Sequence, residues 1–160
     1  MKDDDASGII RADSSAVNIS MFGLDYRYRR QGLKLQGQLY YTLVGNSKQY
    51  NVFTAKNGIS NDLGHAMLGY YTEAGYNINK LLKINNNEWV VFLRYEFVDT
   101  HHAVDDNITR NKAYAERLIT CGMSYYLTKG SVLKGDIVWS KKGSETSFSK
   151  TLNFGFGINF

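Results

Sequence analysis

The sequence contains no proline, a single cysteine and no long apolar run. Proline would remove a backbone donor from a β-ladder, so its absence leaves every position open to strand pairing. The lone Cys121 excludes an internal disulfide. The longest apolar run, WVVFL at 89–93, is far shorter than the roughly 18 residues that a transmembrane helix needs. The opening MKDDDASG lacks a secretory-signal pattern, so we expect a removed signal or a start inside a longer protein.

What the chain does contain favours β-structure. Its 160 residues include 12 tyrosines, 8 phenylalanines, 2 tryptophans and 15 glycines, and aromatic residues are enriched in strands. The length predicts a single all-β domain spanning 1–160. The net charge of +4 is mild and shows no basic stripe, so we expect no nucleic-acid partner.

Apolar and polar residues alternate in about seven segments, which predicts antiparallel strands with two unlike faces. The connections between them are alternately short and long, as in outer-membrane barrels. In the last segment, Leu152, Phe154, Phe156, Ile158 and Phe160 alternate with small or polar residues. The predicted strands are 17–29, 33–43, 66–78, 89–99, 115–127, 132–140 and 152–160.

Charged residues in the middle of these strands share one face. A Lys or Arg facing lipid near the bilayer midplane costs about 2–4 kcal/mol, so this sorting is expected of a membrane barrel, although a soluble barrel would share it. Asp99 and Arg117 break the rule, but we place them at loop ends. The charged residues on the polar face are Asp25, Arg27, Arg29, Lys34, Glu73, Arg94, Glu96, Lys134 and Asp136.

Aromatic residues on the apolar face fall into two groups by height. Membrane barrels carry such aromatic girdles at both interfaces, whereas a soluble core has no reason to sort its rings this way. Together with the charge pattern, the two groups predict an antiparallel transmembrane β-barrel. Tyr28, Tyr76, Trp89, Tyr125 and Phe160 lie at the short-turn ends, and Tyr41, Tyr70, Phe97 and Trp139 at the long-loop ends.

Four stretches carry a family resemblance. NDLGHAMLGYYTEAGYNI, VVFLRYEFVDTHHAV, ITCGMSYYLTKGSVLKGDIVWS and LNFGFGINF together resemble the C-terminal half of the phosphate-selective porin O and P family, in particular its Bacteroidetes members. The resemblance implies a large barrel of the 16-stranded porin class with an aqueous channel, usually a homotrimer, in the outer membrane of a Gram-negative bacterium. The terminal segment ending in Phe160 resembles the signal that the barrel-assembly machinery recognises.

This chain is shorter than the family barrel, so we expect a C-terminal fragment of a larger porin. Residues 1–16 are then a loop or the stub of a further strand. If 6–13 (ASGIIRAD) does form an eighth strand, a small closed barrel is the other possibility.

The charged residues of the polar face are the predicted pore lining, because rings of charge set ion preference in a pore. Equally, they could pair across strands and fill the lumen. DTHHAVDD at 99–106 combines nitrogen and oxygen ligands, but adjacent histidines on a strand point apart, and a polar loop is the better interpretation. We expect no catalytic residues, metal or cofactor, since the sequence carries no nucleophile with a base and an orienting group.

Three functions remain open. The first is an outer-membrane porin that passes small hydrophilic solutes, including anions such as phosphate, down their gradients. The second is a small closed outer-membrane barrel that anchors or adheres and has no pore. The third is a soluble ligand-binding barrel with its apolar residues inside. The first two have membrane lipid as a partner.

Overall fold

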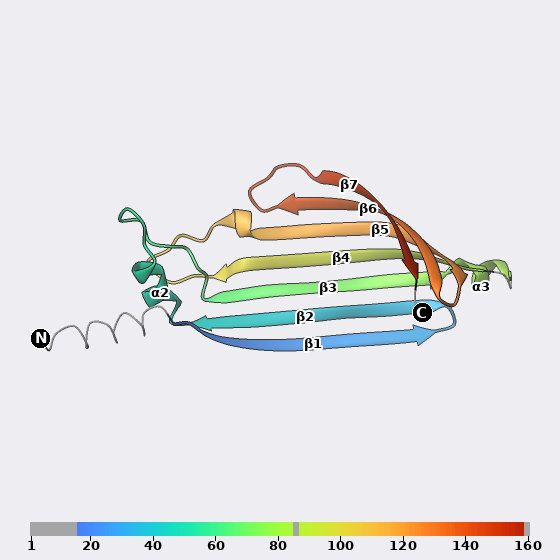
Figure 1. The fold of residues 1–160 in the computed structure, drawn as a ribbon, viewed down its shortest axis with the longest axis horizontal. Coiled ribbons are helices and arrows are strands. Elements are labelled where there is room, and N and C mark those ends of the chain that lie inside the picture. Colours follow the sequence, from blue (N-terminus) through green and yellow to red (C-terminus); the bar gives the residue numbers. More distant parts are fainter. Residues whose placement is uncertain (1–15, 85–86, 159–160) are drawn as a thin grey trace, which may run out of the picture.

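The computed structural model describes residues 16–84 and 87–158, which form one antiparallel sheet of seven strands (Figure 1). Strand order follows the chain, so each strand pairs with the next. The all-β antiparallel prediction is therefore confirmed. The strands are β1 (Asn18–Arg30), β2 (Leu33–Gly45), β3 (Ala66–Asn77), β4 (Glu88–Ala103), β5 (Ala115–Thr128), β6 (Ser131–Lys142) and β7 (Ser149–Ile158).

The sheet is open. β1 and β7 are its two edges, and no backbone pairing joins them within the described residues. Each successive strand reverses direction, so these two edge strands run the same way. The strand number and order are those expected, and the described residues alone do not close into a barrel.

The register keeps the two predicted faces intact from strand to strand. Leu24 of β1 lies opposite Leu39 of β2, which lies opposite Tyr70 of β3, which in turn lies opposite Phe97 of β4. Paired residues of neighbouring strands point to the same side of a sheet. The alternating apolar residues therefore build one continuous apolar face, and the predicted pore-lining residues lie on the other.

The connections differ at the two ends of the strands. A two-residue turn at Gln31 and Gly32, both with positive φ (51° and 89°), joins β1 to β2; glycine tolerates this backbone conformation without strain. Two short helices, α2 (Ser47–Phe53) and α3 (Ile78–Leu82), lie at opposite ends of the sheet (Figure 1). A single turn of 3-10 helix, η1 (Lys112–Tyr114), precedes β5.

Within the described residues, no helix is long and apolar enough to cross a membrane. The helices were not predicted, and Ile78, placed at the end of a strand, instead begins α3.

β4 is longer than predicted, which corrects the position of Asp99. The sequence placed this residue at a loop end, but it lies inside β4, opposite Leu68 in the apolar register. An irregularity between Ala66 and Leu68 shifts the register there. The Asp99 side chain is buried and forms an ion pair with Arg110, so its carboxylate is compensated.

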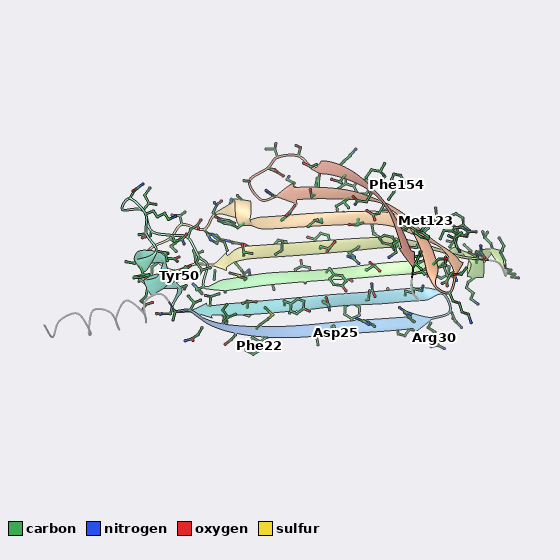
Figure 2. All side chains as sticks on the ribbon, in the orientation of Figure 1. Phe22, Asp25, Arg30, Tyr50, Met123 and Phe154 are labelled. Atoms are coloured by element: carbon green, nitrogen blue, oxygen red, sulfur yellow. The ribbon has the colours of Figure 1, made fainter. Side chains whose placement is uncertain are left out.

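The apolar face carries no covering layer. The only buried apolar side chains among the described residues are Val44, Ala66 and Val90. By contrast, Phe154 is 81% exposed and Leu93 55% exposed on the apolar face. Figure 2 shows Phe22 and Phe154 on strands over which no helix packs. A soluble domain buries such a surface, so this distribution is inverted relative to an ordinary core.

Two predicted features lie outside the described residues. They are the possible strand stub at 6–13 and the terminal Phe160.

Candidate functional site on the polar face

The predicted pore-lining residues share the polar face, and the sheet curves around part of it. Arg27 of β1 and Lys134 of β6 line the same cavity, whose volume is about 300 Å³. In a flat sheet, strands spaced at about 4.8 Å would place β1 and β6 roughly 24 Å apart. Side chains from both strands can reach one cavity because the sheet bends with its polar face inward.

The centre of this face is a network of paired charges. The Glu73 carboxylate accepts hydrogen bonds from Arg94 at 2.8 Å (Nε) and from Gln36 at 2.8 Å. The Arg94 Nη2 atom is 2.7 Å from the same carboxylate, and its Nη1 atom is 3.8 Å from Glu96. The Arg94 guanidinium also stacks 4.9 Å from the Tyr71 ring centroid. Here the predicted cross-strand pairing, which would fill or stiffen the lumen, is present.

Two other predicted residues have polar partners. The Lys34 ammonium is 3.3 Å from the carboxylate of Glu88 and lies 5.3 Å from the Tyr126 ring centroid. Asn153 donates to the carboxylate of Asp136 at 2.8 Å. These contacts tie β2 to β4 and β6 to β7 across the polar face.

Positive charge is in excess within the cavity. Arg27, Arg29 and Lys134 form no ion pair with any acidic residue in the described part of the chain. The predicted acids Asp25 and Glu96 do not line the cavity. The predicted polar face carries five basic and four acidic residues, but the cavity itself has a local cationic surplus, which favours anions. The cavity is lined by the cations Arg27, Arg29, Lys34, Arg94 and Lys134 and by the acids Glu73 and Asp136.

Sequence reasoning missed the apolar part of the cavity wall. Val90 and Phe92 interrupt the alternation of β4 with apolar side chains on the polar face. In the structure both line the cavity, and Phe92 packs over Gly122. A β-carbon on Gly122 would lie 2.6 Å from the Phe92 ring. The strand register would have indicated this position, because it places Phe92 between Gly75 and Gly122, and these glycines leave room for the ring.

No protein-family model, curated protein or solved structure matches this chain. The resemblance to phosphate-selective porins therefore stays a prediction.

The histidine and aspartate residues of 99–106 stabilise the loops at the long-loop end through hydrogen bonds and ring contacts. Asn111 N–H donates to His101 Nδ1 at 3.2 Å, so the other ring nitrogen, Nε2, carries the proton and donates to the Asp62 carbonyl. His102 contacts the Tyr41 ring edge-on. No cluster of three or more His, Cys, Asp or Glu suited to a metal occurs in the described residues.

The same loops are fastened to α2, whose Tyr50 is labelled in Figure 2. Ser47 donates to Asp105 at 2.7 Å, and His65 Nδ1 is 3.6 Å from the same carboxylate. Lys48 donates to Asp106 at 3.2 Å, and this bond holds the pKa of the Asp106 carboxyl below its usual value. His65 is thus a polar group at the rim of the sheet.

The aromatic residues of the apolar face make contacts at both ends of the strands. Near the short turns, the rings of Trp89 and Tyr125 stack with their centroids 4.2 Å apart. Toward the long loops, the ring centroids of Tyr70 and Phe97 are 5.5 Å apart. Cys121 is an exposed free thiol on this same face. The described part of the predicted assembly signal, Leu152, Phe154, Phe156 and Ile158, is exposed on β7.

Proposed function

We propose that this chain is part of an outer-membrane porin that lets small hydrophilic solutes, particularly anions such as phosphate, diffuse across the membrane. The observation that carries the proposal is the inverted arrangement of the sheet. Its apolar face is exposed and uncovered, while its charged face curves around a cationic cavity. Lipid is the environment that accepts the first surface, and water accepts the second.

In this function the protein performs no chemistry and needs no cofactor. The excess of Arg and Lys side chains raises the local concentration of anions, and the polar wall replaces part of their hydration. Glu73 and Arg94 neutralise each other, so the cations without an acidic partner carry the preference. The barrel-assembly machinery and two further copies of the chain, as a homotrimer, are the partners that this function implies.

The experiment that tests the orientation places spin labels on both faces of the reconstituted protein. Labels at Leu35, Leu68 and Ile137 should report a lipid environment, with broadening by dissolved oxygen. Labels at Lys34 and Asp136 should respond to a water-soluble relaxation agent. The reverse assignment would contradict the proposal and would favour a soluble barrel with an apolar interior.

A second function, a closed barrel that anchors or adheres without a pore, is favoured by one observation. The inner side of the sheet is occupied by the hydrogen-bonded network of Gln36, Glu73 and Arg94 and by the Phe92 ring. Such side chains would fill the lumen of a closed barrel. Recording from planar lipid bilayers separates the two functions. Discrete conductance steps support the porin, whereas correct membrane insertion without conductance supports the anchor.

A further inference from the structure

We propose that α3 and Ile84, together with Trp89 and Tyr125 of the sheet, form a binding site for a phospholipid with a negatively charged headgroup. The inference rests on the proposed function, because it requires the apolar face to lie in a membrane. It adds a specific lipid contact at one end of the strands.

Apolar side chains of α3 project from the end of the sheet. Leu81 is 70% exposed, Leu82 60% and Ile84 46%. Exposure of three large apolar side chains within four residues is unfavourable in water. Leu82 and Ile84 lie beside Trp89 and Tyr125 of the apolar face, at the level where the strands end.

The fold holds these residues rigidly in place through a buried amide. Asn79 is only 7% exposed; it donates to the Asn87 carbonyl at 2.8 Å and accepts from the Trp89 amide at 2.9 Å. Its backbone amide is bound at 3.0 Å by the side chain of Asn77, the N-cap of α3. The projection of the leucines is thus imposed by specific hydrogen bonds.

An apolar groove connects α3 to the stacked pair of aromatic rings. It has a volume of about 460 Å³, and Ile78, Leu82 and Ile84 line it from the connection while Trp89 and Tyr125 line it from the sheet. Asn87 donates to the Tyr125 hydroxyl at 2.7 Å and fixes that ring. Trp89 and Tyr125 belong to the apolar register, so the groove continues the proposed lipid-facing surface.

Basic residues lie at the same end of the strands as this groove, outside its lining. Lys80 and Lys83 flank the leucines, and the stem of Lys80 lies against Gly32 of the neighbouring turn. Arg30 ends β1 in the apolar register (Figure 2). Within the described residues none of the three forms an ion pair, and the nearby acid, Glu88, pairs with Lys34.

This combination suits one occupant. The acyl chains would contact the leucines and the aromatic pair, and the headgroup phosphate would meet the two lysines. Amphipathic rings and basic side chains at a membrane interface favour anionic lipids. A neutral lipid would satisfy the apolar groove but leave the cations without a counter-charge.

The test uses Trp89 as the reporter in the reconstituted full chain. Trp139→Phe leaves Trp89 as the sole tryptophan. Quenching of its fluorescence is compared in vesicles that contain brominated phosphatidylglycerol or brominated phosphatidylcholine at equal mole fraction. We expect the anionic quencher to be at least about threefold more effective, because each basic residue adds to the local attraction.

Replacement of both lysines, Lys80→Gln with Lys83→Gln, should bring the ratio of the two quenchers to about one. The matched control, Lys48→Gln with Lys56→Gln at the long-loop end, should leave it unchanged. A ratio of one in the parent, with both lipids quenching, overturns this inference and leaves the porin proposal intact. Absence of quenching by either lipid contradicts both, because Trp89 would then be out of contact with the membrane.

Discussion

At the scale of single residues, Gly37 shows how closely the strands of this sheet are matched. Tyr26 reaches across Gly37 from β1 and bonds the Thr72 hydroxyl of β3 at 2.5 Å. A β-carbon at Gly37 would lie 2.5 Å from the Tyr26 ring and 2.6 Å from the Tyr71 carbonyl oxygen. The aromatic ring covers the gap that glycine leaves between its neighbours.

Gly37→Ala should therefore lower the free energy of unfolding by about 1–3 kcal/mol, since the ring and the backbone must both move. Denaturant unfolding in detergent micelles measures the change. Gly155→Ala is the matched control, because a β-carbon there meets nothing within 4 Å. Equal stability of the two variants would show that the Tyr26 ring is displaced at no cost.

The buried Asp99 carboxylate depends on its single charged partner. Arg110 binds one carboxylate oxygen, and the His101 amide donates to the other at 2.9 Å. Arg110→Gln should cost about 1.5–3 kcal/mol of unfolding free energy, because a buried charge loses a charge-assisted bond. The half-exposed position of Arg110 keeps the cost below that of a fully buried pair.

Adding Asp99→Asn to Arg110→Gln should restore part of the loss, because no charge is then left unpaired. Lys112→Gln is the control at a nearby exposed lysine. Additive losses in the double variant would contradict direct coupling of the two side chains.

Tyr114 gives the loops a pH-dependent contact. Its hydroxyl donates to the Asp62 carboxylate at 2.9 Å, and this bond, together with the negative charge, raises the pKa of the Tyr114 phenol. The stabilisation is fully present below the pKa of tyrosine in the unfolded chain, which is near 10. It is lost as the pH rises through the higher pKa of Tyr114 in the folded protein.

Nuclear magnetic resonance of the labelled Tyr114 ring should show titration above the ordinary tyrosine range. Asp62→Asn should bring the pKa back toward that range. An unchanged pKa in this variant would show that the Asp62 contact is not its cause.

At the scale of elements, the strands could be predicted because their signal is local. Alternation places side chains on opposite faces whatever the partner strand is, so β1, β2, β3, β5 and β6 begin and end within one or two residues of prediction. β4 runs to Ala103 because pairs beyond the alternating segment, including Ala66 with Ala103, extend it.

The short helices could not be predicted, because contacts distant in sequence hold them. Asn51 of α2 is fully buried and exchanges two hydrogen bonds with the backbone of Leu63, at 2.8 and 2.9 Å. A helix of seven residues is not stable alone, and no apolar periodicity marks it. The same holds for the candidate site. The face on which each of its residues lies follows from the alternation, but its ion pairs could not be predicted without the register between the strands.

β1 contributes Arg27 and Arg29, two of the three cations of the cavity that have no acidic partner, so it should dominate ion preference. Arg27→Glu with Arg29→Glu reverses two charges of the wall. We expect the reversal potential in a salt gradient to shift toward cation preference, because the surplus of positive charge is then removed. The control, Lys56→Glu with Lys112→Glu, changes two lysines that lie outside the cavity. An unchanged reversal potential in the β1 variant would remove these arginines from the permeation path.

At the scale of the whole molecule, the unpaired edges set a condition on membrane insertion. Unsatisfied backbone amides in hydrocarbon cost several kcal/mol each, so β1 and β7 must find partners in a bilayer. The sequence left both an open fragment and a small closed barrel possible, because closure depends on the curvature of the sheet and on strands beyond it.

Hydrogen exchange measures whether the edges are paired. In the reconstituted protein, amides of β1 and β7 should be as protected as those of the central β4. Rapid exchange at alternate positions of the edge strands, with β4 protected, would show that the sheet stays open and would contradict a barrel.

The common direction of β1 and β7 limits how a ring could be completed. Copies of the sheet that are inserted with the same polarity can meet edge to edge only through a parallel seam. A fully antiparallel ring needs an odd number of intervening strands at the junction. The segment that completes such a ring must therefore contribute an odd number of strands, so that the total number of strands is even.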